Sequence, residues 1–322
     1  MKPSADRDAF VGQRQARWAR LDRALKEPRR DAAAWSALAA DYRAVCADLA
    51  RGRAIGVPAD VLEFLDNLAG RAHNTLYGTQ RGGGLGLLRA VAVGFPQEVR
   101  AQAGFFWLAT ALFYGPFAVG ALGSLADPAF AAAVLPESQL ASMEQAYGDG
   151  DLSRGFGGDA TMAGFYVMNN VGIAFRCFAT GALAGLGSVF YLVYNGLMIG
   201  TVLGHLTSVG LGGNLLEFIC GHSMWELTGV CTAGTAGLRL GWAMVVTDGR
   251  TVAGSLRAAG PSLYRLVLGT TVLLLVAAAI EGFWSAGPAP RPLKLVFAAV
   301  QVVIVVSWLW FGGRGARRVG ER

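Results

Sequence analysis

The fold is decided by residues 161–208, which read TMAGFYVMNNVGIAFRCFATGALAGLGSVFYLVYNGLMIGTVLGHLTS. Over these positions Arg176 is the only Asp, Glu, Lys or Arg. A helix needs about 20 predominantly apolar residues to cross the hydrocarbon core of a bilayer. The stretch is therefore long enough for two membrane spans, and a break near Gly185–Gly187 is expected to separate them.

The rest of the chain divides into a soluble-like part and a membrane-like part. Of its 322 residues, 53% are hydrophobic and 16% are charged, against about 25% charged in soluble domains. Residues 1–100 contain 16 of the 28 Lys and Arg residues and 11 of the 22 Asp and Glu residues. The predicted order is a cytoplasmic amphipathic helical region, an interfacial elbow, a transmembrane domain and a basic tail, at residues 1–80, 81–102, 103–313 and 314–322.

The N-terminal region is predicted to form three helices. Apolar residues recur at helical spacing over residues 5–27. Asp31 precedes a second such stripe and is the expected N-cap of the next helix. The third helix is expected to begin at Pro58 and to end at Gly78.

The predicted fold is all-α and polytopic, with about six spans. They are expected at residues 103–125, twice within 161–208, and at 218–246, 266–286 and 295–312. Residues 126–160 form an acidic loop with a short helix at 137–147, and residues 209–216 form a glycine-rich turn. Residues 1–100, the loop 248–265 and the tail are net basic, so the positive-inside rule predicts cytoplasmic termini and an external 126–160 loop.

Several function classes are not indicated by the sequence. No dense basic tract interleaved with aromatic residues points to nucleic acid. The four cysteines form no CxxC pair, and the N-terminus has no apolar run typical of a cleavable signal peptide. There is no nucleophile elbow, Walker loop or dinucleotide fingerprint. We therefore predict no catalytic residue, metal or cofactor.

A polar cluster is expected inside the membrane domain, because polar groups at membrane depth face a protein interior or water. His222 and Glu226 are four residues apart and share one helix face. Proton or polar-substrate handling, a metal site and a structural hydrogen-bonded pair all remain open; HExxH is absent, and His205 adds a third ligand only if the fold brings it near. Arg176 is expected either to pair with Glu226 or Glu217 or to extend its side chain to the outer membrane interface. The predicted cluster is Asn169, Asn170, Arg176, Glu217, His222 and Glu226.

Glycines recur at spacings that let helices approach closely. One set is Gly196, Gly200 and Gly204, and the other is Gly234, Gly237 and Gly241. Intramolecular packing is the first interpretation; a homo-oligomer or gaps along a path are the alternatives.

A second group of candidate residues lies before the first span. It consists of Arg71, His73 and Tyr77 on the third N-terminal helix and Arg100 on the elbow. These side chains are expected either to be solvated and cap a helix junction or to take part in function.

Several of these segments resemble, in order and spacing from Arg71 to about Arg257, the stage II sporulation protein M family. Where relatives often read His-Gly-x-x-Glu, this chain has Ser223 after His222. The segments are RAHNTLY (71–77), Phe95-Pro96 with Arg100, Asn169-Asn170, Asn195-Gly196, HSMWEL (222–227) and AGTAGLRLG (233–241).

The resemblance implies a multi-pass protein of the bacterial inner membrane that acts as a scaffold. It would anchor partners that remodel peptidoglycan or the envelope. The expected partners are the lipid bilayer, other membrane or envelope proteins, or further copies of the chain. The alternative is a transporter or channel-like protein with a polar intramembrane path.

Overall fold

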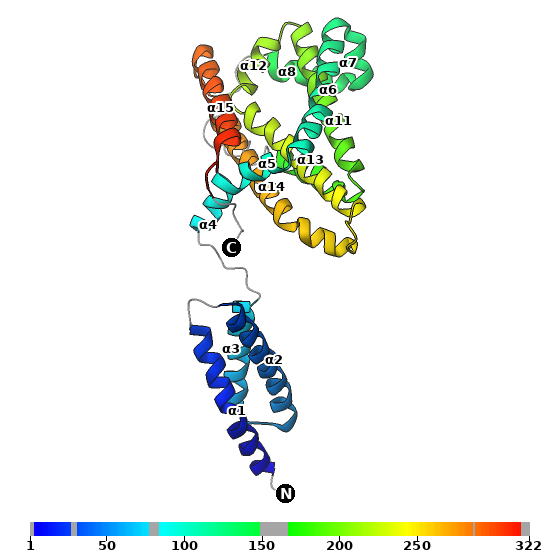
Figure 1. The fold of residues 1–322 in the computed structure, drawn as a ribbon. Helices are drawn as coiled ribbons and strands as arrows, with labels where there is room; N and C mark the ends of the chain where they lie inside the picture. The colour runs from blue at the N-terminus through cyan, green and yellow to red at the C-terminus, as the bar shows by residue number, and fades with distance from the viewer. Residues whose placement is uncertain (1–2, 27–30, 77–83, 149–166, 286, 317–322) are drawn as a thin grey trace. The chain divides into compact units, whose positions relative to one another are not determined.

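The computed structural model consists of two compact units, Met1–Gly83 and Gly84–Arg322 (Figure 1). All regular elements in the described residues are helical. The structure describes residues 3–26, 31–76, 84–148, 167–285 and 287–316.

The first unit is a three-helix bundle of α1 (Pro3–Lys26), α2 (Ala32–Ile55) and α3 (Ala59–Leu76). Asp31 caps α2 as predicted, because its side chain accepts a hydrogen bond from the Ala34 N–H at 2.7 Å. The bundle has a core of its own, to which all three helices contribute; its fully buried members include Leu21, Leu38, Val45, Leu65 and Ala72.

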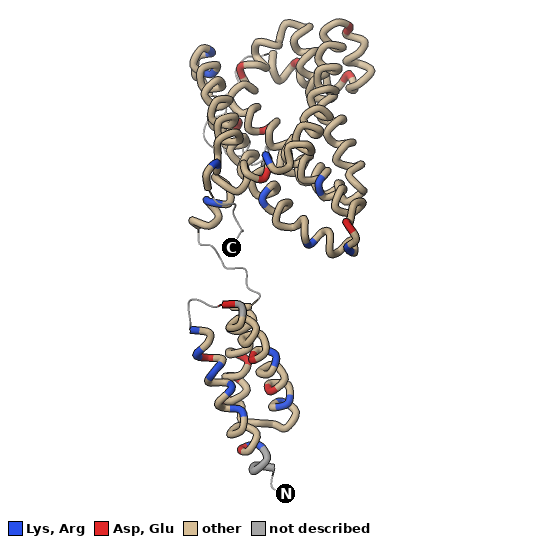
Figure 2. Tube along the Cα trace, viewed as in Figure 1, with Lys and Arg blue, Asp and Glu red and all other residues tan. Residues whose placement is uncertain are grey.

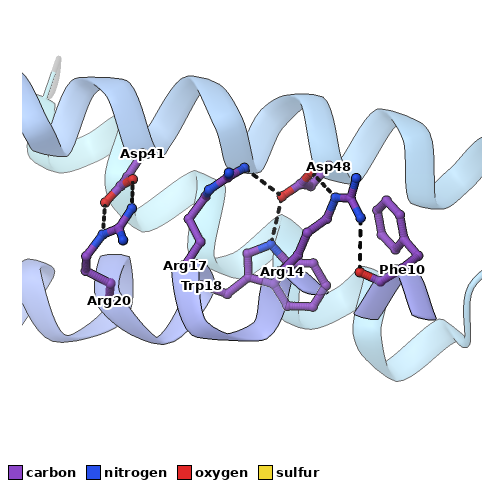
Figure 3. Close-up of polar contacts among 7 residues, drawn as sticks. All are labelled: Phe10, Arg14, Arg17, Trp18, Arg20, Asp41 and Asp48. Carbon is purple, nitrogen blue, oxygen red and sulfur yellow. Dashed lines mark hydrogen bonds and ion pairs between the residues drawn. The ribbon is translucent and has the colours of Figure 1, made fainter. Parts of the chain in front are cut away.

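A buried carboxylate joins α1 to α2 (Figure 3). Asp48 accepts hydrogen bonds from Trp18 Nε1 at 3.0 Å and from Arg14 Nε at 2.9 Å, and Arg17 lies 3.8 Å away. The Arg20–Asp41 pair lies further along the same two helices and is more exposed. Because Asp48 is buried, these donors replace the water that would otherwise solvate its carboxylate.

We expect Asp48→Ala to loosen the contact between α1 and α2, whereas Asp41→Ala has a much smaller effect. Removal of Asp48 leaves the buried Trp18 N–H without an acceptor, which costs about 1–3 kcal/mol. Hydrogen–deuterium exchange of the full-length protein checks this through the amides of α2. Equal exchange rates in the two variants would contradict it.

In its described residues the second unit has four helices that are long and apolar enough to cross a membrane. They are α6 (Ala103–Ala126), α11 (Leu186–Ser208), α14 (Val252–Ile280) continued by the π-helical turn η4 (Glu281–Ser285), and α15 (Arg291–Phe311). The protein is therefore multi-pass. Of the six expected spans, these four helices correspond to those at 103–125, in the second half of 161–208, at 266–286 and at 295–312.

The other two expected spans differ from the long apolar helices for separate reasons. The first half of residues 161–208 contains only short described pieces: η2 (Val167–Val171), α10 (Gly172–Ala179) and η3 (Thr180–Ala182). The predicted break is present, because Ala184 and Gly185 have φ angles of 51° and 85°. The span expected at 218–246 is α13 (Ser223–Val245), with 13 of its 23 residues buried.

Helix α13 is the core helix of the second unit and packs against α6, α10, α11 and α14. Its buried residues are mostly small, with Gly, Ala, Thr and Cys predominating. Small side chains let neighbouring backbones approach closely. Its composition, which also includes Glu226 and Arg239, therefore suits burial among other helices rather than contact with lipid.

Two expected loops are helical in the structure. Most of the loop predicted at 248–265 belongs to α14, which Thr251 caps by accepting a hydrogen bond from the Gly254 N–H at 3.1 Å. The turn predicted at 209–216 overlaps α12 (Gly212–Ile219). The predictions were wrong there because Arg257, Arg265 and the glycines suggested loop, whereas capping and packing extend the helices.

The elbow consists of α4 (Gly84–Arg89), the π-helical turn η1 (Ala90–Gly94) and α5 (Phe95–Ala101). Leu85, Leu87 and Leu88 of α4 are exposed, as expected for a segment at the membrane interface. Phe95 is fully buried and its ring contacts α14 at Gly269. The elbow is thus part of the second unit.

The acidic loop begins with α7 (Pro128–Val134) and α8 (Glu137–Gly148), the latter close to the helix predicted at 137–147. Figure 2 shows acidic residues on this part of the second unit, and basic residues on the elbow and the first half of α14. Arg291 and Lys294, at the start of α15, are exceptions to this separation.

Candidate functional site: a buried His–Glu–Glu cluster

The candidate site lies where α12, α13, α14 and α15 approach one another. Helix α12 ends at Ile219, and a short turn leads to His222, which immediately precedes α13. Glu226 occupies the first turn of α13, and Glu281 begins η4 at the end of α14. These elements bring Glu281 close to His222 and Glu226, from which it is separated by 55 or more positions in the sequence.

His222 is the centre of the cluster and is buried. Its Nδ1 shares a hydrogen bond of 2.9 Å with Ser285 Oγ. Its Nε2 lies 3.7 Å from a carboxylate oxygen of Glu226 and 3.9 Å from one of Glu281. The imidazole therefore has one nitrogen fixed by a hydroxyl and the other directed toward two carboxylates.

The amides predicted to belong to the cluster approach it from η2. Asn170 is buried and its Nδ2 lies 3.5 Å from Glu281 Oε2, at the limit for a hydrogen bond. Asn169 donates to Asn170 Oδ1 at 3.0 Å. The amide pair thus extends the cluster from α13 and η4 to the segment before α10.

A second polar group adjoins the cluster through Ser285. Lys294 of α15 is buried and donates from Nζ to the Ser285 carbonyl oxygen at 2.9 Å. Its other neighbour is Glu217 of α12, at 3.5 Å. Lys294 thus holds the backbone carbonyl of Ser285, and the side chain of Ser285 hydrogen-bonds to His222.

Comparison with known proteins identifies two regions of the chain. The sequence profile of stage II sporulation protein M matches residues 103–286, more than half of the chain. This protein belongs to the stage II sporulation protein M family. Residues 8–78 match a domain of unknown function, DUF8413. Neither a curated protein nor a solved structure matches the chain.

The stage II sporulation protein M region contains all three members of the central cluster, namely His222, Glu226 and Glu281. The matched region ends at residue 286 and therefore does not include Lys294. The resemblance was also drawn from residues 71–77 and 95–100, and these lie outside the match. The family membership predicted from sequence is confirmed for residues 103–286.

Glu281, Ser285 and Lys294 were missed in the sequence analysis. Glu281 interrupts an otherwise apolar run, and a carboxylate at that depth is itself a sign of a polar site. Lys294 is likewise the only Asp, Glu, Lys or Arg among residues 292–313. The signal was present in both cases, but the approach of α14 and α15 to His222 depends on tertiary packing.

The expected ion pair of Arg176 with Glu226 or Glu217 is not formed within the described residues. Arg176 is exposed on α10, whereas Glu226 faces His222 and Glu217 faces Lys294. The prediction was wrong because the buried face of α10 contains Ala174 and Cys177, whereas Arg176 lies on the exposed face. His205 is not a member of the cluster either, since it lies 2.7 Å from Glu144 of α8.

Both glycine sets of this protein pack against other segments of the same chain. Gly196, Gly200 and Gly204 of α11 face α6 so closely that an added Cβ would overlap the carbonyl oxygens of Phe113, Phe117 and Ala121. The α13 set contacts the segment between α10 and α11 and the first turns of α11; its members are Gly234, Gly237 and Gly241.

The other candidate residues have structural contacts. Arg71 forms a salt bridge with Asp22 at 2.7 Å, and His73 Nδ1 lies 3.1 Å from the Tyr42 hydroxyl. Arg100 donates to the carbonyl oxygens of Leu309 and Gly312 and so caps the end of α15. Tyr77 lies outside the described residues.

Proposed function

We propose that this protein is a membrane scaffold whose N-terminal three-helix unit binds partner proteins while the second unit anchors it in the bilayer. The proposal includes cytoplasmic termini in a bacterial inner membrane. It also includes α13 and the segment before α11 as membrane crossings, which brings the number of spans to six. Envelope-remodelling proteins are the proposed partners, as the resemblance described in the sequence analysis implies.

The observation that carries the proposal is a groove between α1 and α3. It has a volume of about 420 Å³, and its apolar lining includes Val11, Trp18, Val61 and Phe64. The Phe64 side chain is 44% exposed, which is unusual for an aromatic residue beside a formed core. Such a groove accommodates the apolar face of an amphipathic helix.

The charges beside the groove indicate the chemistry of its occupant. Asp22 and Asp60 both line it. Asp22 already pairs with Lys26 and Arg71, so Asp60 is the carboxylate that a partner would meet. We propose a partner helix that carries Lys or Arg beside its apolar residues, because opposite charges steer and orient such a contact.

Transport is the second candidate function, and the His222 cluster is the observation that favours it. Buried ionisable residues in membrane proteins frequently mark ion or proton pathways. A cavity of about 410 Å³ among the described residues of the second unit lies at the opposite end of α13 and is lined by Arg239, Trp242 and Arg250, among others. We place scaffolding first because the groove between α1 and α3 offers a defined surface for a partner.

Photo-crosslinking of the full-length protein in its native membrane tests the scaffold. A photoreactive amino acid at position 64 is expected to yield a discrete crosslinked protein, and the additional change Asp60→Lys is expected to reduce its yield several-fold. The same probe at Arg51, an exposed position on α2, is the control. Crosslinks to lipid alone at position 64, or equal yields at both positions, would contradict the proposal.

A further inference from the structure

We propose that His222, Glu226 and Glu281 form a binding site for a divalent transition-metal ion inside the helical bundle. One ligand atom from each residue lies within 4.8 Å of the other two. An imidazole with two carboxylates suits Zn²⁺ or Mn²⁺ better than Ca²⁺, which takes six to eight oxygen ligands. The site is independent of the groove on the N-terminal unit.

The distances fit ligands that share an ion better than they fit direct hydrogen bonds. His222 Nε2 lies 3.7 Å from Glu226 and 3.9 Å from Glu281, which is beyond hydrogen-bonding range. Metal–ligand bonds of about 2.0–2.2 Å separate two ligand atoms by up to roughly twice that length. All three ligand atoms lie within 4.8 Å of one another, so a slight approach of the side chains would bring them within reach of one ion.

The surroundings of His222 match those of a metal-ligating histidine. Such a residue usually hydrogen-bonds through its second ring nitrogen, which fixes the ring orientation. Here Nδ1 is held by Ser285 Oγ at 2.9 Å, and the Ser285 carbonyl is held by Lys294. Asn170 contacts the Glu281 oxygen that is not directed at His222.

The charge of the cluster also calls for a cation. Glu281 is buried and Glu226 is largely buried, and in the described residues neither forms an ion pair with Lys or Arg. The ammonium group of Lys294, which adjoins the cluster through Ser285, pairs with Glu217 instead. Two carboxylates this close together repel each other unless a cation or a shared proton neutralises part of their charge.

A bound ion would join segments distant in the sequence. It would connect the start of α13 to η4 at the end of α14, and through Asn170 to η2. Since a ligand that binds only the folded state stabilises it, the metal should raise the melting temperature of the bundle.

Metal binding to the full-length protein in detergent tests the site. The protein is first stripped with a chelator, then incubated with Zn²⁺ or Mn²⁺, desalted, and analysed for metal content and melting temperature. We expect one ion per chain and a higher melting temperature. His222→Ala and Glu281→Gln should each weaken binding at least 10-fold.

The controls separate this site from other carboxylates and from misfolding. Glu144→Gln and His205→Ala, which change the other His–Glu pair, should bind the metal as the wild type does. Metal-free Glu281→Gln should melt no lower than the metal-free wild type, because it removes one buried charge, yet metal should no longer raise its melting temperature. Absence of stoichiometric metal in the wild type, or unchanged binding by Glu281→Gln and Glu226→Gln, would overturn the site and indicate a shared proton instead.

Discussion

Gly200→Ala is expected to destabilise the second unit by about 1–3 kcal/mol, the usual cost of overpacking a well-packed interface. An added Cβ at Gly200 overlaps the carbonyl oxygen of Phe117, and this is backbone that cannot rotate away. Helices α6 and α11 must therefore separate, which also disturbs the contacts at Gly196 and Gly204. Combining the three substitutions should prevent the pair from packing.

Gly115→Ala is the matched control for this prediction. Gly115 lies in α6, is exposed, and has open space where a Cβ would be placed. Alanine is the better helix former by about 1 kcal/mol, so this variant should be neutral or slightly more stable. Thermal unfolding in detergent measures both variants, and equal melting temperatures would show that the α6–α11 contact does not determine stability.

Glu98→Ala is expected to release the elbow from α14. Glu98 is buried on α5 and accepts hydrogen bonds from Ser262 Oγ at 2.6 Å and Arg265 Nη1 at 2.9 Å. Gln102 donates to the same carboxylate at 3.1 Å. Loss of hydrogen bonds to a charged group costs about 1.5–3 kcal/mol. Faster hydrogen exchange in α5 should report this change.

The Glu98 contact should also depend on pH. Burial alone raises the pKa of Glu98, but hydrogen bonds from Ser262 and Gln102 and the Arg265 guanidinium outweigh it and leave the pKa below its ordinary value of 4.5. A lowered folded-state pKa stabilises the fold above the ordinary value, and this stabilisation is lost as the pH falls through the folded pKa. Glu98→Gln should therefore flatten the acid limb of the stability curve, whereas Glu137→Gln, at an exposed position, should not.

The elements predictable from sequence are those determined by local rules. The three N-terminal helices follow from apolar periodicity and the Asp31 cap, and the break before α11 follows from its glycines. The long apolar spans follow from length and composition. Helix α13 was expected as an ordinary span, because burial on most sides depends on which helices surround it.

The candidate site was predictable to a similar extent. His222 and Glu226 are four residues apart on one face, so their proximity follows from helix geometry. Glu281, Ser285 and Lys294 reach the same place only through the packing of α14 and α15. The wrong partner was predicted for Arg176 for the same reason, because the sequence alone does not determine how α10 is rotated about its axis.

The burial of α13 has a consequence for biosynthesis, if this helix crosses the bilayer as proposed. A translocon releases helices into lipid according to their own hydrophobicity, and α13 carries Glu226, Arg239 and many small polar residues. Its main neighbour, α14, is synthesised after it. Helix α13 would then wait at the translocon or the membrane surface until α14 emerges, and the two would enter the bilayer as a pair.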